Sequence, residues 1–325
     1  MMWRRTFLHT AALALPLGAP AAVHAQTYPA RTVRIVVPVA VGGSADKLAR
    51  VLAQQLGAQW KQSVVVENVP GASSSIGTTH VVRAPADGYT LLLGGEQLAV
   101  SLAIGSVLPY DPRKDLRGIV KAVVNPQLLV VRPGLGVKDF AGYVELLKKR
   151  PGQITMALPA GKGSLQHLAV EMLNARLGLR TNNIPYPGGG PATLDVLGGH
   201  VDAMLITLAA ATQNVRSGKL VALAVTTSTR SRALPEVPTL QELGVAGYVV
   251  ESWQGLLAPA ATPPSLVAQI HRDAVGVLRR PDITAQLEDL GFNLSAGTPA
   301  DVDKTIADDV EAYKKVVQQA GIQPT

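Results

Sequence analysis

The stretch from Val33 to Gly57 limits what this chain can fold into more than any other. Val33 to Val37 predicts a buried strand, Gly42-Gly43-Ser44 follows in a short loop, and apolar residues at helical spacing then run to Gly57. Such a strand, loop and helix unit is typical of parallel sheets. Because a helix that begins on glycine and serine presents unpaired backbone N–H groups at its positive end, the loop suits an anion.

The same pattern continues along the first third of the chain. A strand is expected at residues 63–67, then a Gly/Ser loop at 68–77, a helix to about 83 and a strand at 89–93. This alternation predicts a doubly wound, mainly parallel α/β sheet, whose ligands lie beyond the carboxyl ends of its strands.

The length of 325 residues and a second set of α/β units predict two domains. The proline-rich passage 108–112 is interpreted as the crossing into the second domain, and a strand at 220–226 as the return. The predicted limits are residues 27–125 with 223–325 for domain 1 and residues 126–222 for domain 2.

The first 25 residues are predicted to be a signal peptide. Arg4-Arg5 precedes an apolar run from Ala11 to Val23 and the small-residue cleavage pattern Val23-His24-Ala25. The twin arginines also fit folded export, and the sequence leaves the two routes open. Because the chain has no cysteine, disulfides, thiol catalysis and lipid attachment at an N-terminal cysteine are excluded, and a freely soluble extracytoplasmic protein is expected.

Composition also limits the partners. The formal charge of +7 arises from scattered basic residues and aromatics are only 4%, so a nucleic-acid groove is not expected. The six histidines show no metal-ligand spacing. We therefore predict no metal, no cofactor and no catalytic residues.

Four Gly- or Ser-rich turns, two in each predicted domain, follow strands. Together they predict a cleft lined by N–H donors and hydroxyls, which suits a carboxylate because several neutral donors can match it without a buried unpaired cation. None of them has the ending of a phosphate-binding loop or the third glycine of a dinucleotide fingerprint.

Individual side chains have local alternatives. Ser44 and Ser164 are predicted N-caps, with ligand contact open in addition, and Ser164 lacks a nucleophile-elbow context. Asp46 is interpreted as a dipole-compensating acid and His167 as a local hydrogen-bonding residue. Two further residues have similar alternatives. Glu96 is predicted to be a solvated loop acid rather than a ligand for an ammonium, and Trp253 a core or interface ring rather than a ligand contact.

The chain resembles Bug-type substrate-binding proteins of tripartite tricarboxylate transporters along its mature length. The matching blocks are Tyr28-Pro29, Gly42 to Asp46, Val64 to Asn68, Pro70-Gly71, Ile76-Gly77, Asp87 to Leu92, Leu108 to Pro112, Gly163-Ser164, His167 to Ala169, Pro185-Tyr186, Pro191-Ala192, Gly198-Gly199, Val201-Asp202, Leu223 to Thr226, Arg230-Ser231, Leu234-Pro235, Val237 to Thr239, Trp253 and Ala258-Pro259.

The resemblance implies a periplasmic, two-domain Venus-flytrap receptor that closes on a small carboxylate, passes it to integral membrane transporter subunits and, we expect, acts as a monomer. Carried over by position, the residues facing the ligand are Gly42, Gly43, Ser44, Ser73, Ser74, Ser75, Gly161, Gly163, Ser164, Gly188 and Gly189.

Departures from the family pattern leave the ligand open. Val39, Val41, Val69 and Pro187 replace the usual aromatic, proline, arginine and lysine, and Ser73 to Ser75 lie in a loop that is normally richer in glycine. A sensory receptor for a signalling partner and a secreted enzyme on the same fold are the alternative functions. The sequence names neither the carboxylate nor the partner.

Overall fold

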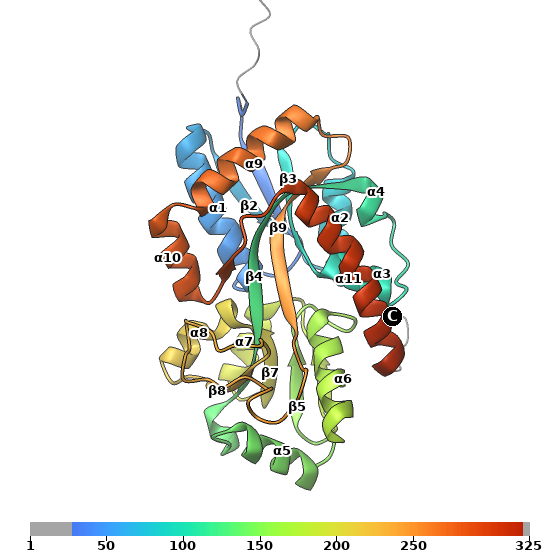
Figure 1. The fold of residues 1–325 in the computed structure, drawn as a ribbon, viewed down its shortest axis with the longest axis vertical. Helices are drawn as coiled ribbons and strands as arrows, with labels where there is room; N and C mark the ends of the chain where they lie inside the picture. The colour runs from blue at the N-terminus through green and yellow to red at the C-terminus, as the bar shows by residue number, and fades with distance from the viewer. Residues whose placement is uncertain (1–27, 321–325) are drawn as a thin grey trace, which may run out of the picture.

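The computed structural model describes residues 28–320, so the predicted signal peptide lies outside the described residues. Two lobes are stacked along the long axis and joined by two strands that run between them (Figure 1). The strands form one sheet in the order β2-β1-β3-β9-β4-β7-β5-β6, and β10 and β8 also pair with β4.

The first lobe contains the predicted βα units. Strands β1 and β2 pair in parallel, as do β1 and β3, and helices pack on the faces of the sheet. Its elements up to the crossing are β1 (Val33–Val37), α1 (Ser44–Trp60), β2 (Val64–Asn68), α2 (Ser75–Val82), β3 (Thr90–Gly95), α3 (Gln97–Ala103) and α4 (Pro112–Asp115).

The second lobe repeats this design. Strand β5 lies between β6 and β7 and is parallel to both. Its elements are η1 (Pro133–Leu135), α5 (Phe140–Lys149), β5 (Thr155–Leu158), α6 (Leu165–Leu177), β6 (Asn182–Pro185), α7 (Gly189–Leu197), β7 (Ala203–Thr207), α8 (Leu208–Arg216) and β8 (Val221–Val225).

The crossing between the lobes differs from the expectation. A single strand of 16 residues, β4 (Leu116–Val131), runs through both lobes, and its first part pairs with β9 (Glu251–Pro259). The expected strand at 127–131 is the second half of β4, so residues 108–112 precede the crossing strand rather than form it. The strand expected to return to domain 1 is β8, but it pairs with Leu128–Val131 in the second lobe, and β9 carries the chain back. The limits at 125/126 and 222/223 stay a prediction.

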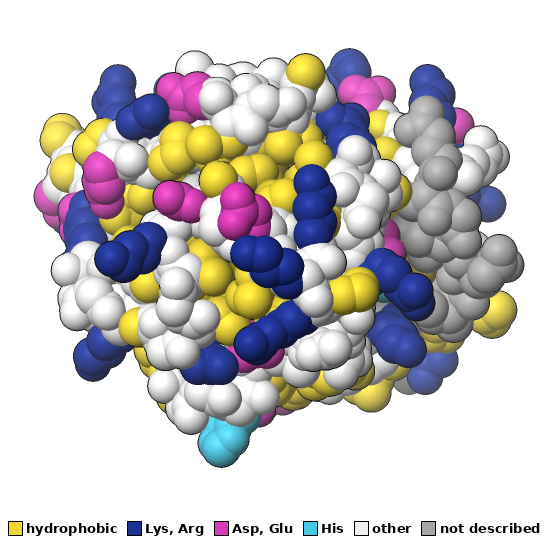
Figure 2. Space-filling model, turned by 90° about the horizontal axis from the view of Figure 1, so that it is seen from below, with side chains coloured by type: hydrophobic (Ala, Val, Ile, Leu, Met, Phe, Trp, Pro, Cys, Tyr) yellow, Lys and Arg dark blue, Asp and Glu magenta, His cyan; other side chains and the backbone are white. Residues whose placement is uncertain are grey.

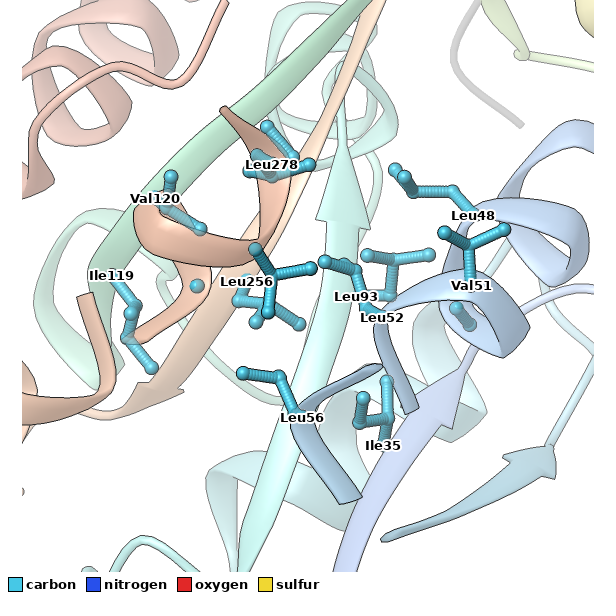
Figure 3. Close-up of a cluster of buried hydrophobic side chains, with 14 of the residues drawn as sticks. Ile35, Leu48, Val51, Leu52, Leu56, Leu93, Ile119, Val120, Leu256 and Leu278 are labelled. Carbon is cyan, nitrogen blue, oxygen red and sulfur yellow. The ribbon is translucent and has the colours of Figure 1, made fainter. Parts of the chain in front are cut away.

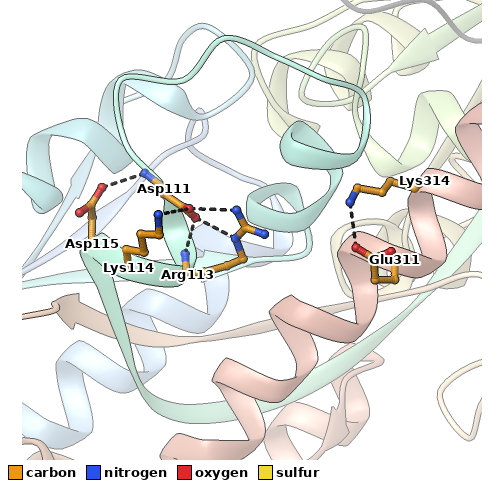
Figure 4. A network of polar contacts seen from close by, with 6 residues as sticks. All are labelled: Asp111, Arg113, Lys114, Asp115, Glu311 and Lys314. Atoms are coloured by element: carbon orange, nitrogen blue, oxygen red, sulfur yellow. Dashed lines mark hydrogen bonds and ion pairs between the residues drawn. The ribbon is translucent and has the colours of Figure 1, made fainter.

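The C-terminal segment contacts both lobes. It comprises α9 (Pro264–Leu278), α10 (Pro281–Leu290), β10 (Asn293–Leu294) and α11 (Pro299–Ala320). Tyr313, Val316 and Val317 of α11 pack against the apolar cluster of the second lobe. Close to α11, Asp111 caps α4, accepts a hydrogen bond from the Arg113 N–H and pairs with the Arg113 guanidinium (Figure 4). The guanidinium lowers the pKa of Asp111.

The core of the first lobe explains why α1 forms where it does. Leu48, Leu52 and Leu56 are fully buried at helical spacing and meet Ile35 of β1 and Leu256 of β9 (Figure 3). Burial of such a side chain stabilises the fold by about 1.5–3 kcal/mol. This packing fixes the position of the α1 N-terminus at the sheet edge.

On the face seen in Figure 2, neither positively nor negatively charged side chains form a large continuous patch. Lys and Arg side chains are spread over that end of the molecule, with acidic and hydrophobic side chains between them. Within the described part of the chain, none of the helices combines the length and apolarity that a membrane crossing needs.

Candidate functional site

A cavity of about 100 Å³ lies between the two lobes at the carboxyl ends of their strands, and we call it the central cavity. Gly43 and Ser44 line it from the first lobe, and Gly188, Gly189 and Thr207 line it from the second. The sheet topology therefore brings the loops after β1, β6 and β7 together at one place.

The N-termini of two helices meet at the wall of this cavity. Gly43 is the N-cap of α1 and Gly188 is the N-cap of α7, and neither helix has a side-chain cap. A Cβ placed on Gly43 would lie only 3.7 Å from the Gly189 nitrogen. Because both positive helix ends point at the same space, an anion there would stabilise both.

The predicted N–H donors divide into two groups. Among residues 28–320, no acceptor is found for the N–H groups of Gly43, Ser44, Gly188 and Gly189, which stay free for a ligand.

The other predicted donors are occupied locally. The Gly42 N–H donates to the Asp46 carboxylate at 3.0 Å, the Gly161 N–H to the Leu158 carbonyl and the Gly163 N–H to His167 Nδ1 at 3.1 Å. The Arg50 guanidinium also bonds Asp46, and these hydrogen bonds lower the pKa of Asp46 against the effect of its burial.

The two serines expected to be N-caps differ. Ser164 caps α6 and its Oγ accepts from the His167 N–H at 3.2 Å, while its side chain is fully buried. For Ser44 the cap prediction is wrong, because α1 begins on Ser44 and Gly43 takes the cap position. Ser44 Oγ instead accepts from Gln254 Nε2 at 2.8 Å, so its own O–H can donate into the central cavity, which Ser44 lines.

The serine loop of the first lobe lies nearer the mouth. A groove of about 300 Å³, which we call the mouth groove, is lined by Ser73, Ser74 and Gly161, and Ser74 also reaches the central cavity. Ser73 Oγ donates to the Lys162 carbonyl of the other lobe at 3.1 Å. Ala72, Ser73 and Ser74 all have positive φ, which costs free energy for residues with a side chain and is held in place by the surrounding contacts. Ser75 begins α2 and lines neither space.

Three amide side chains of the central cavity were not predicted. They are Gln97 at the start of α3, Gln166 on α6 and Gln254 on β9. Gln97 Nε2 donates to the Gly163 carbonyl at 3.2 Å, which joins the two lobes. No motif marks these residues, because each is brought to the cavity by a partner distant in the sequence.

Glu96 is the one ionisable residue that lines the central cavity within the described chain. Burial raises the pKa of its carboxyl to about 7, and the nearby Asp309 carboxylate adds to the rise. Glu96 is therefore not the solvated loop acid that was expected. Trp253 is buried, and its indole N–H donates to Asp309 at 2.9 Å, which confirms its interpretation as a core ring.

The lobes touch through several direct hydrogen bonds beside the cavity. The Ala40 N–H donates to the Pro187 carbonyl at 3.3 Å, and Lys47 Nζ donates to the Ala209 carbonyl at 2.8 Å. Burial lowers the pKa of Lys47. These contacts hold the two lobes together beside the cavity.

The residues around the cavity are suited to binding rather than to metal chemistry. In the part of the chain that the structure describes, no group of three or more His, Asp or Glu side chains is arranged to hold a metal ion. The cavity wall consists of backbone N–H groups, hydroxyls, amides and the Glu96 carboxyl, with apolar residues between them.

Comparison with known proteins gives the family. Residues 48–322 match the family described as the tripartite tricarboxylate transporter family receptor, TctC. The chain belongs to this family. It is 37% identical to protein BugT of Bordetella pertussis over 317 residues, and this alignment covers 97% of this chain and 95% of BugT.

Two solved structures share the fold. The periplasmic binding protein BugD superposes with a TM-score of 0.87 at 33% identity, covering 91% of this chain and 99% of BugD. MatC from Rhodopseudomonas palustris with bound malate superposes with a TM-score of 0.84 at 30% identity, and the match covers 89% of this chain and all of MatC. The resemblance to Bug-type receptors and the expected two-domain periplasmic-binding-protein fold are confirmed.

Proposed function

We propose that this TctC-family receptor captures a small organic carboxylate in the central cavity and delivers it to the membrane subunits of a tripartite tricarboxylate-type transporter. The supporting observation is the apposition of the α1 and α7 N-termini, with free N–H groups at Gly43, Ser44, Gly188 and Gly189. Bound malate in MatC, a member of the same fold, agrees with this ligand class.

The N–H and hydroxyl donors account for the preference, and the raised pKa of the Glu96 carboxyl, about 7, limits the negative charge on the same wall. A carboxylate received by four N–H groups and the Ser44 hydroxyl is matched without a buried lysine or arginine, and neither residue type lines the cavity within residues 28–320. Since the anion contacts both lobes, it stabilises the closed arrangement more than the open one, and its differential affinity shifts the population toward closure.

The route and the state of the protein follow from the same proposal. The chain is exported to the periplasm through a cleaved signal peptide at residues 1–25, acts there as a monomer, and performs no chemistry on its ligand. Uptake of the ligand lost in a deletion strain would support transport, whereas loss of gene induction with intact uptake would indicate a sensor.

A calorimetric screen tests the binding step. Mono-, di- and tricarboxylates and acidic amino acids are titrated near neutral pH, with uncharged amides and amines of similar size as controls. We expect a carboxylate to bind and to raise the melting temperature. Binding by the uncharged controls alone would contradict the proposal.

A further inference from the structure

A chain of buried amides leads from the crossing strand to the wall of the central cavity. Gln127 on β4 is fully buried, and its Nε2 donates to the Asn125 backbone carbonyl at 3.2 Å and to Ser252 Oγ at 3.1 Å. A backbone carbonyl can only accept, so the NH₂ end of Gln127 must face Asn125. The Gln127 Oε1 is thereby fixed as an acceptor on the other side.

Gln166 takes its orientation from that oxygen. Its Nε2 donates to Gln127 Oε1 at 2.9 Å, and turning the amide over would place two oxygens against each other. The opposite end of the Gln166 amide is therefore its oxygen, which the relay through Gln127 holds in place from β4.

This oxygen is an unused acceptor in the cavity. Gln166 lines the central cavity and is only 6% exposed. Within residues 28–320 no group donates to Gln166 Oε1, and the side-chain atoms sealed from solvent without a partner belong to Asn125, Gln254 and Thr262 instead. Gln166 Oε1 therefore opens to the cavity with its hydrogen-bonding capacity free.

We propose that Gln166, held by Gln127, selects carboxylates that also carry a hydrogen-bond donor, namely hydroxy- or amino-carboxylates. The inference rests on the proposed function, since it assigns the second part of the same ligand. The carboxylate lies at the α1 and α7 N-termini beside Ser44, and the hydroxyl or ammonium lies at Gln166 of the second lobe. A carboxylate without a donor leaves a desolvated oxygen in the closed cavity, and a site built to bond an O–H or N–H rejects the analogue that lacks it.

Matched ligands test this directly by calorimetry. The pairs are malate with succinate, lactate with propionate, and 2-hydroxyglutarate or glutamate with glutarate. At least one donor-bearing member should bind about 10- to 100-fold more tightly than its partner. In Gln166→Met, which keeps the side-chain length but removes the acceptor, the ratio should fall to about 1.

The control variant is Gln213→Met on the exposed face of α8, which should keep the wild-type ratio. Melting curves establish that each variant is folded, and the wild-type ligand pairs give a result even if Gln166→Met does not fold. Carboxylates that bind without preference for the donor, or a preference that survives in Gln166→Met, would overturn the inference while leaving the proposed function intact. Failure of every carboxylate to bind would overturn both.

Discussion

A single methyl group added at Gly190 should hinder closure of the two lobes without destabilising either lobe. A Cβ added there would overlap the carbonyl oxygen of Val41 in the other lobe and stand 3.1 Å from the Val41 carbonyl carbon. The residue lies in the first turn of α7. Because alanine favours a helix by up to about 1 kcal/mol over glycine, Gly190→Ala should leave the separate lobes as stable as before.

The magnitude follows from the cost of overpacking. Forcing an extra methyl into a packed contact costs about 1–3 kcal/mol. If the lobes move apart instead, the Ala40 to Pro187 and Lys47 to Ala209 hydrogen bonds are lost, at about 1 kcal/mol each. Either response lowers the population of the closed form by a comparable amount, so ligand affinity should fall about 5- to 150-fold.

The assay combines calorimetry with small-angle scattering. Gly190→Ala should bind the carboxylate found in the screen more weakly and should fail to contract fully on addition of ligand, while its melting temperature without ligand stays within a few degrees of wild type. The matched control is Gly276→Ala in α9, where an added Cβ meets nothing within 4 Å. Wild-type affinity in Gly190→Ala would refute the argument that the lobes must approach this closely.

Three further predictions concern stability. The pKa of Glu96 is about 7 in the folded protein against the ordinary 4.5, so the stability that its neutral form contributes is complete below pH 4.5 and is lost as pH rises through 7. Glu96→Gln should therefore raise the free energy of unfolding at pH 8 by at most about 3 kcal/mol and leave it unchanged at pH 4. Equal gains at both pH values would argue against this cause. Lys61→Gly should raise the free energy of unfolding by about 1 kcal/mol, because Lys61 has a φ of 54° at the C-cap of α1 and glycine adopts this left-handed conformation without strain. A lower free energy of unfolding in urea would disprove this. Leu52→Ala should cost about 2–5 kcal/mol in the same assay, because Leu52 is fully buried in the first-lobe core, and a cost under 1 kcal/mol would show that the cluster collapses around the gap.

The sequence predicted the first lobe well because its signals are local. The apolar run of β1 and the helical spacing of Leu48, Leu52 and Leu56 depend on neighbours along the chain. The structure has β1 at the expected residues, and α1 continues three residues past the expected stop at Gly57, to Trp60. The glycine loop between them accordingly lies at the sheet edge, where a ligand was expected.

The crossing between the lobes was harder to predict. The Asn125-Pro126 pair between the two halves of β4 would ordinarily predict a turn, but the strand continues through it. Its passage from one lobe to the other depends on pairing first with β9 and then with β7 and β8. Such pairings join residues far apart in the sequence, from 72 positions for Val131 with Ala203 to 143 positions for Leu116 with Pro259. Periodicity within one strand carries no information about them.

The site was predicted in part for a similar reason. Gly43, Ser44, Gly188 and Gly189 follow a local rule about helix N-termini, and all four line the central cavity. The amides do not follow such a rule, because Gln254 meets Ser44 across 210 positions and Gln166 meets Gln127 across 39.

A crystal structure with the tightest-binding carboxylate tests the central claim most directly. We expect one carboxylate in the central cavity, with its oxygens within hydrogen-bonding distance of the Gly43 and Ser44 N–H groups on one side and of Gly188 or Gly189 on the other. A ligand held by one lobe alone, or bound outside the cavity at saturating concentration, would contradict the account.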